Sequence, residues 1–364
     1  MRRAMLSLLA VLWAAPIVAA CGAAFEPPSR IKSLRVMGVK VDPPYGKPGK
    51  SSQLEILYFD GSSRAYLPDG LTPDPEHRVQ VLWLAGCHNP SGDLYYRCFP
   101  ILAEKFASLG PPGAMSGPPP VELLDYIGQG ERFTLKIPAD IISSKPETTS
   151  DNTPYGLSYT FFAVCGGKFG PPSEASAGFP IGCYDEKTGA ALGQDDFVFG
   201  YTPTYTYDEV VNKNPIISGM TFEKEPSMNV ACTSPADCKA TERCGKSGAC
   251  IPVVPHCTEK QQIDCKTYEI KPTMVEDDNA EIDVVSPELD GKTPEEIIWL
   301  NYYTSDGTLE RELALVNDAQ KGWVPKHETK WSAPNAFAGE TRVWVVAHDN
   351  RGGTAWAFQD IFVE

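Results

Sequence analysis

The sequence is poor in the residues and motifs that usually carry catalysis. It has only five histidines in 364 residues, at His77, His88, His256, His327 and His348. None of them forms an H-x-x-x-H pair or lies near a G-x-S-x-G segment, and no glycine-rich stretch has phosphate-loop or dinucleotide spacing. His348 stands beside Asp349, but no nucleophile accompanies the pair, so we expect a surface or turn residue there. These absences argue against an enzyme, and no cofactor is expected.

Positive charge is also scarce. Lysine and arginine number 32 against 47 aspartates and glutamates, which gives a formal net charge of −15. Such a surface repels nucleic acid and anionic lipid headgroups, so no nucleic-acid partner is expected. The acidic clusters at 276–279 and 194–196 lack the spacing of an EF-hand. We interpret them as solvated loops and expect no metal site there.

The chain opens with an export signal. Arg2 and Arg3 precede an uncharged, mostly apolar run from residue 5 to residue 20. This is the layout of a secretory signal, and the run is shorter than the about 20 residues that span a bilayer. The tetrapeptide Val-Ala-Ala-Cys at 18–21 resembles the lipobox of bacterial lipoproteins. An ordinary signal peptide cut after Ala20 is the alternative.

The resemblance to a lipobox implies a lipid anchor at Cys21. Diacylglyceryl transfer to its thiol, cleavage after Ala20 and acylation of the new amino group would attach two or three chains, palmitate among them. Each buried methylene contributes about 0.8 kcal/mol, so this anchor in the lipid bilayer is durable. In such lipoproteins Gly22, in place of aspartate, favours the outer membrane. The face of that membrane is left open.

The cysteine count agrees with export. Eleven cysteines minus Cys21 leave ten, an even number that suggests five disulfides in an oxidising compartment. The ten are Cys87, Cys98, Cys165, Cys183, Cys232, Cys238, Cys244, Cys250, Cys257 and Cys265. The expected third strand and the later strand at 157–165 should be antiparallel neighbours, so their C-terminal ends lie apart. We therefore predict the pairs Cys87–Cys98 and Cys165–Cys183.

The six cysteines from Cys232 to Cys265 form a compact cysteine-rich module. The segment contains no phenylalanine or tryptophan, and tyrosine is also absent, so it needs cross-links to fold. Structural zinc sites usually space their ligands two to four residues apart, whereas the intervals here are six or more. Three disulfides are therefore favoured over zinc. Their connectivity is left open, because six cysteines allow 15 arrangements.

Short alternating strands separated by proline and glycine turns predict β-sandwiches. In the segment 79–87, Val79, Val81, Trp83, Ala85 and Cys87 are expected to share one face. A short helix is expected at 100–108.

The order of strands is then repeated from residue 214 onward. The expected strands of the second copy lie at 214–226, 280–288, 295–303 and 342–353, with the last strand at the C-terminus. Trp299 occupies the place of Trp83, and both are interpreted as core residues.

The run of valines leading to Asp-Asn-Arg-Gly at 349–352 resembles the penultimate strand and turn of PKD or fibronectin-type domains. As a whole, the chain resembles uncharacterised bacterial outer-membrane lipoproteins with tandem immunoglobulin-like domains and an inserted cysteine-rich module. The predicted fold is all-β: a signal peptide at 1–20, a tether at 21–30 and two sandwiches at 31–212 and 213–364. The module is expected as an insertion at about 227–279 of the second sandwich.

These features predict a non-enzymatic, membrane-anchored lipoprotein that binds a protein or glycan partner or supports the envelope. An exported hydrolase, or an accessory domain of one, is the alternative; it would need a pocket with convergent polar groups. Tyrosines in loops suit such contacts. The candidates are Tyr95, Tyr96, Tyr201, Tyr205, Tyr207, Tyr302 and Tyr303, and one member of each adjacent pair is expected in the core.

Overall fold

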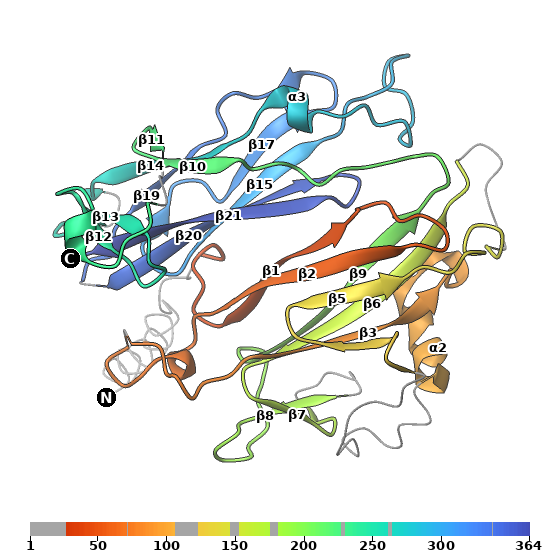
Figure 1. The fold of residues 1–364 in the computed structure, drawn as a ribbon, viewed down its shortest axis with the longest axis horizontal. Coiled ribbons are helices and arrows are strands. Elements are labelled where there is room, and N and C mark those ends of the chain that lie inside the picture. The colour runs from red at the N-terminus through yellow and green to blue at the C-terminus, as the bar shows by residue number, and fades with distance from the viewer. Residues whose placement is uncertain are drawn as a thin grey trace, which may run out of the picture.

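The chain is an all-β protein of two immunoglobulin-like sandwiches with a small disulfide-rich insertion (Figure 1). The computed structural model describes residues 27–364 apart from 71, 106–122, 146–152, 175–180, 227–229, 261–263 and 337. The expected signal peptide at 1–20 and the lipidation site Cys21 lie outside the described residues. Within them, no helix is long and apolar enough to cross a membrane.

In the part of the chain that the structure describes, the first domain carries nine strands and one short α-helix. They are β1 (Leu34–Asp42), β2 (Ser51–Asp60), β3 (Gln80–His88), α2 (Cys98–Lys105), β4 (Ile127–Gln129), β5 (Arg132–Lys136), β6 (Gly156–Cys165), β7 (Lys168–Gly170), β8 (Gly182–Tyr184) and β9 (Phe197–Thr206). One sheet has the order β1-β2-β5 and the other β4-β3-β6-β9. Trp83 is fully buried between them, stacked on Phe133 with ring centroids 6.0 Å apart. The core tryptophan expected here is therefore in place.

The β4-β3-β6-β9 sheet is covered on both faces, which explains why every residue of β6 is buried. Its outer face packs under α2 and beside the β7–β8 hairpin. The expectation that Cys87 shares a face with Trp83 is wrong. A bulge between Leu84 and Cys87 shifts the register, so Cys87 joins the outer cluster with α2. Gly86 makes the bulge possible with a φ of +99°, and a Cβ there would lie 2.7 Å from Tyr126.

The second domain repeats the order of the first. Its strands are β10 (Gly219–Phe222), β11 (Glu225–Pro226), β14 (Thr267–Thr273), β15 (Ile298–Thr304), β16 (Thr308–Leu309), β17 (Leu313–Asp318), β18 (Gly322–Trp323), β19 (Thr329–Ser332), β20 (Gly339–Asp349) and β21 (Thr354–Val363). One sheet runs β11-β10-β14-β19-β16, and the other includes β21-β20-β15-β17. The order β10-β14-β19 thus matches β1-β2-β5, and β17-β15-β20-β21 matches β4-β3-β6-β9.

The second strand of this copy differs from the expectation. Residues 280–288 contain no strand, and Ile282 and Val284 are more than half exposed. The strand β14 takes that place, because alternation in Tyr268, Ile270 and Pro272 directs these side chains inward. The inserted module therefore occupies the gap from β11 to β14 and ends before Thr267, not near residue 279. The short helix α3 (Glu276–Asn279) follows in the next connection.

Trp299 is also placed differently from the expectation. It is half-buried on the outer face of β15, stacked on His348 at 5.5 Å. The core face of β15 carries Ile298, Leu300 and Tyr302 instead. Position within the strand pattern, rather than residue type, decided which side chain entered the core.

The two domains pack directly against each other. Ile31, Met37, Trp344 and Val346 are buried in a cluster between the outer face of β1 and β2 and the outer face of β20 and β21. The rings of Phe59 and Trp344 lie 4.7 Å apart. The boundary expected at 212 and 213 falls in the connection between β9 and β10.

The start of the described chain is held by the second domain. Thr304, at the end of β15, donates its amide to the Ser29 carbonyl and accepts a hydrogen bond from the Ile31 amide. Arg30 forms an ion pair with Asp306 at 2.5 Å. The chain therefore touches the second domain before it enters β1 of the first.

Candidate functional site

The four cysteines of the first domain form two disulfides. The structure joins Cys87 to Cys98 and Cys165 to Cys183, the pairing expected from the strand order. All four are fully buried in the cluster on the outer face of the β4-β3-β6-β9 sheet. The Cys87–Cys98 bond fixes the start of α2 to β3.

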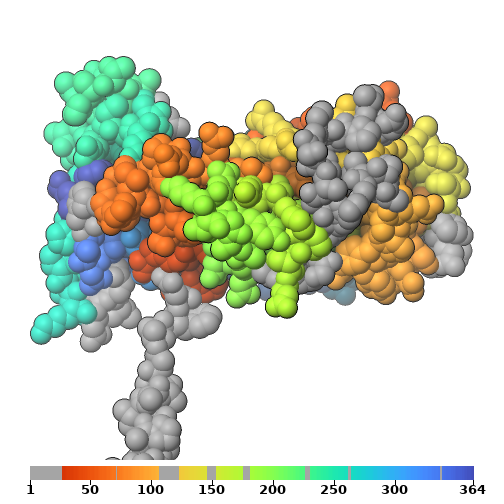
Figure 2. Space-filling view, turned by 90° about the horizontal axis from the view of Figure 1, so that it is seen from below, coloured from red at the N-terminus to blue at the C-terminus, as the bar shows by residue number. Residues whose placement is uncertain are grey.

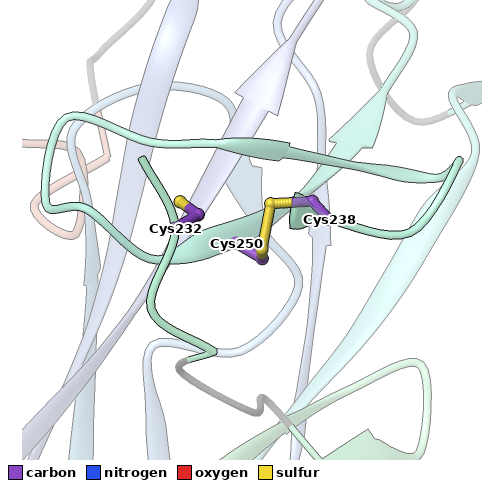
Figure 3. Close-up of side chains that lie close together, drawn as sticks. All are labelled: Cys232, Cys238 and Cys250. Atoms are coloured by element: carbon purple, nitrogen blue, oxygen red, sulfur yellow. A yellow bond between two sulfur atoms is a disulfide. The ribbon is translucent and has the colours of Figure 1, made fainter. Parts of the chain in front are cut away.

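The cysteine-rich module has the pairing Cys232–Cys244, Cys238–Cys250 and Cys257–Cys265. Figure 3 shows three of these side chains, Cys232, Cys238 and Cys250, gathered around one point. Their sulfurs lie within 4.8 Å of one another, close enough for metal ligands. Because each sulfur is already in a disulfide, it is not a thiolate and does not offer the charge that zinc needs.

The module extends the second domain's sheet. Its strands are β12 (Glu242–Cys244) and β13 (Cys250–Val254), and β13 pairs in parallel with the end of β21. The Arg243 guanidinium lies 3.8 Å from the Phe362 ring centroid, and the Lys246 amide donates to the Glu340 carboxylate. The module thus covers the edge of β21 that would otherwise expose unpaired backbone groups. It stands at one end of the long axis, and α2 lies toward the other (Figures 1 and 2).

The histidines are dispersed and serve local packing. His77 contacts the Asp60 carboxylate at 2.7 Å, and His88 contacts the Ser158 hydroxyl at 2.8 Å. Burial lowers the pKa of His88 to about 4, so it is neutral at pH 7. His348 is not the surface or turn residue expected from the sequence; it is half-buried within β20, and burial lowers its pKa.

A buried ionic network lies where the two domains meet. The Arg351 guanidinium contacts Glu296 at 2.8 Å and Glu281 at 2.6 Å. Burial raises the pKa of Glu296 to about 7, and nearby Asp349 adds to this rise while Arg351 opposes it. The Tyr45 ring, from the first domain, lies 5.9 Å from the Arg351 guanidinium.

The same turn fixes the connection between the domains. The Asp349 carboxylate accepts bonds from the amides of Arg351 and Gly353 and from the Asn212 side chain. Asn214 accepts the Thr354 amide and donates to the carbonyl of Val41 in β1. The Asp-Asn-Arg-Gly turn recognised in the sequence therefore positions the connecting segment between the two sandwiches.

Of two open clefts, one lies beside this junction and the other lies past the C-terminal end of β15. The larger, about 500 Å³, is formed by the end of β1, the connecting segment 212–217 and Trp356 of β21. The smaller, about 290 Å³, lies between Arg30, Asp306 and Asn335. No histidine, cysteine or serine is among the described residues that line either cleft, so neither combines a nucleophile with a histidine base.

The tyrosines suggested as contacts divide between interior and surface. Tyr302 is fully buried, Tyr303 packs at the domain junction and Tyr207 is buried. Tyr95 and Tyr96 are 39% and 46% exposed, so the expectation that one of this pair enters the core is wrong. They lie on a 3-10 turn, Tyr95–Arg97, where neighbours do not alternate between two faces as they do in a strand.

Tyr95, Tyr96, Phe99 and Tyr201 form what we call the aromatic patch. Their exposed fractions run from 39% to 51%, and they come from the turn before α2, from α2 and from β9. Tyr95 stacks on Tyr201 with ring centroids 4.4 Å apart and planes inclined by 16°. Tyr96 and Phe99 meet the Tyr95 ring nearly at right angles. Phe199, two residues before Tyr201 on β9, is also exposed.

The loop that presents the patch is held at several points. Asn89 accepts the Leu157 amide and donates to the Ile141 carbonyl. The Asp93 carboxylate contacts Lys145 at 2.9 Å and accepts the Tyr155 hydroxyl at 2.5 Å. Both Asn89 and Asp93 have positive φ angles, a conformation that persists only where the surroundings enforce it. With the Cys87–Cys98 bond, these contacts fix the rings before any partner arrives.

Comparison with known sequences identifies no relative: no protein-family model matches the chain, and no curated protein matches it. These two comparisons therefore do not test the resemblance to outer-membrane lipoproteins that the sequence suggested.

Among solved structures, the alignments are with tandem β-domain proteins. They include the three N-terminal domains of the bacteriophage RB49 outer capsid protein Hoc, with 9% identity and a TM-score of 0.17 over 91% of this chain and 70% of that one. Fibronectin(III)-like modules of Clostridium thermocellum CbhA align at 10% identity and 0.17, over 90% and 94%. Tandem Ig repeats of Dlar align at 8% and 0.19, over 92% and 98%. These TM-scores are too low to carry an argument about function.

Proposed function

We propose that the protein is an exported, lipid-anchored, non-enzymatic binding protein whose contact surface is the aromatic patch. The observation that carries the proposal is the patch itself: four exposed rings held on a disulfide-fixed support. Binding surfaces are enriched in tyrosine and phenylalanine, and rings that are already ordered lose little entropy when a partner docks. The partner class at this level is a protein or a glycan.

The five disulfides support export, because such bonds persist in oxidising compartments. The lipobox-like segment at 18–21 supplies the membrane anchor at Cys21, and Gly22 favours the outer membrane. The roughly eight residues from Cys21 to the fixed residue Ser29 reach at most about 28 Å. That fixed residue is held at the end of β15, whereas α2 lies toward the opposite end of the molecule (Figure 1). The patch would therefore face away from the membrane.

The hydrolase alternative has less support. Neither cleft has a histidine base among its described lining residues, and Glu296, the carboxyl with a pKa raised to about 7, is buried against Arg351. A group closed off in this way does not reach a substrate.

The anchor and the surface are tested separately. Growth with a clickable palmitate analogue should label the wild-type protein, whereas Cys21→Ser should be unlabelled and should leave the membrane fraction. For the surface, a photo-crosslinking amino acid at position 96 should capture a partner in cells. Capture should fall when Tyr201→Ala is added and should persist when Phe358→Ala, an exposed ring on β21, is added. Unchanged capture in Tyr201→Ala would remove the patch from the proposal.

A further inference from the structure

We infer that the ligand of the aromatic patch is an uncharged polysaccharide, an inference that rests on the proposed function and narrows its partner class. The four rings are exposed and close together: Tyr95 and Tyr201 are stacked with nearly parallel planes, and Tyr96 and Phe99 stand nearly at right angles to Tyr95. A pyranose ring offers an apolar C–H face to such a ring and hydroxyls to the tyrosine oxygens around it. Stacking of this kind is tolerant of sequence, as it is for bases on aromatic platforms.

Charge decides against an ionised ligand. The Asp93 carboxylate beneath the patch is already bound by Lys145 and Tyr155. The Arg97 guanidinium lies 5.6 Å from the Tyr96 ring centroid, and Lys105 on α2 lies 3.8 Å from the Tyr126 ring. The protein as a whole carries a formal charge of −15, which repels polyanions. Arg97 keeps its charge in this contact, so it is the long-range field of the acidic protein that favours a neutral ligand over an acidic one.

Shape decides for a polymer over a small molecule. The patch residues line neither of the two clefts described above and are 39–51% exposed, so a ligand bound on them stays partly open to solvent. Small ligands that bind tightly usually bury most of their surface in a cavity. An extended chain instead gathers affinity from several weak contacts along its length. Phe199 and Tyr201 lie on one face of β9, about 7 Å apart along the strand, so they offer successive contacts in one direction.

The support of the rings suits a rigid, extended ligand. Phe99 packs on the buried Phe161 at 5.8 Å, and Tyr159, which packs against Tyr201, donates its hydroxyl to the Asp93 carbonyl. The rings are consequently fixed from below while their outer surfaces stay exposed. A fixed cluster of this kind offers exposed ring faces and edges at set positions, and the repeated apolar faces of a neutral polysaccharide can contact them one after another.

Affinity gel electrophoresis of the full-length protein tests the inference. Native gels would contain hydroxyethylcellulose, laminarin, dextran or amylopectin as neutral polymers, and alginate or polygalacturonate as acidic ones. At least one neutral polymer should retard the protein, and the acidic ones should not. Tyr95→Ala and Tyr201→Ala should each raise the apparent dissociation constant for that polymer, obtained from the retardation, about tenfold. Tyr201→Phe should keep most of it, because the ring is retained.

Phe358→Ala is the matched control, since it removes an exposed ring from the second domain. If Tyr95→Ala or Tyr201→Ala lowers the melting temperature of the protein, Tyr96→Ala and Phe99→Ser replace them as tests of the patch. Retardation by acidic polymers alone, by none, or equally in wild type and Tyr95→Ala would overturn the inference. A protein crosslinked through position 96 and lost in Tyr201→Ala, without polysaccharide binding, would overturn it while the proposed function stands. If neither a crosslinked protein nor a polysaccharide binds at the patch, both the inference and the proposed function are wrong.

Discussion

The Arg351 guanidinium lies 2.8 Å from the Glu296 carboxylate, and both side chains are at least 97% buried beside the domain junction. The pair connects the turn after β20 to the residues just before β15, while Tyr45 of the first domain lies close to the same guanidinium. The first domain therefore contacts a charged pair of the second domain as well as the apolar cluster around Trp344.

Removing one partner of this pair should strongly destabilise the protein. Arg351→Met leaves Glu296 and Glu281 without their shared counter-charge, and breaking a buried pair costs about 3–5 kcal/mol where the carboxylate is ionised, so unfolding is measured at pH 8. Lys213→Ala removes an exposed contact to Glu281 and should leave stability unchanged. Urea unfolding of both variants measures the difference. Equal midpoints would show that Arg351 does not stabilise the junction.

The same pair should give the protein a distinctive pH dependence. Burial raises the pKa of Glu296 to about 7 from an ordinary value of 4.5, so this carboxyl takes up a proton on folding between those pH values. Its contribution to stability is present below about pH 4.5 and is lost as the pH rises through 7. The melting temperature of Glu296→Gln should consequently fall less between pH 5 and pH 7.5 than that of the wild type. Parallel curves would contradict the raised pKa.

The Cys87–Cys98 bond should hold the aromatic patch in place. Replacing both cysteines with serine should lower the free energy of unfolding by about 2–4 kcal/mol, because the reduced chain gains freedom when unfolded. It should also weaken partner capture at position 96, because Cys98 begins the helix that carries Phe99. Replacement of Cys257 and Cys265 should leave capture unchanged, since the patch lies in the other domain. A loss of capture only in the second variant would contradict this role.

The two tryptophans should differ in their effect on stability. Trp83→Ala removes a fully buried side chain from the first core and should cost about 3–5 kcal/mol. Trp299→Ala removes a half-buried ring stacked on His348 and should cost about 1 kcal/mol. Thermal or urea unfolding of the two single variants tests the assignment. An equal loss in the free energy of unfolding would show that Trp299 is a core residue like Trp83.

The amino-acid sequence alone determined the all-β class, the presence of the inserted module and most of the repeated strand order, but not the second strand of the second copy. Period-two alternation and turn residues are local signals, so they survive without knowledge of the fold. The pairing of Cys87 with Cys98 also followed, because antiparallel order places the end of β3 far from the end of β6.

Only the tertiary structure decided which face each residue meets. One extra residue at the Gly86 bulge moved Cys87 to the opposite face of its sheet. Ile282 pairs with Glu295 only as an isolated bridge, and both Ile282 and Val284 stay exposed. The connectivity of the module, the packing of Phe59 on Trp344 and the gathering of Tyr95 with Tyr201 also came from the fold. These contacts join residues far apart in the chain, and no local pattern records which distant surfaces will meet.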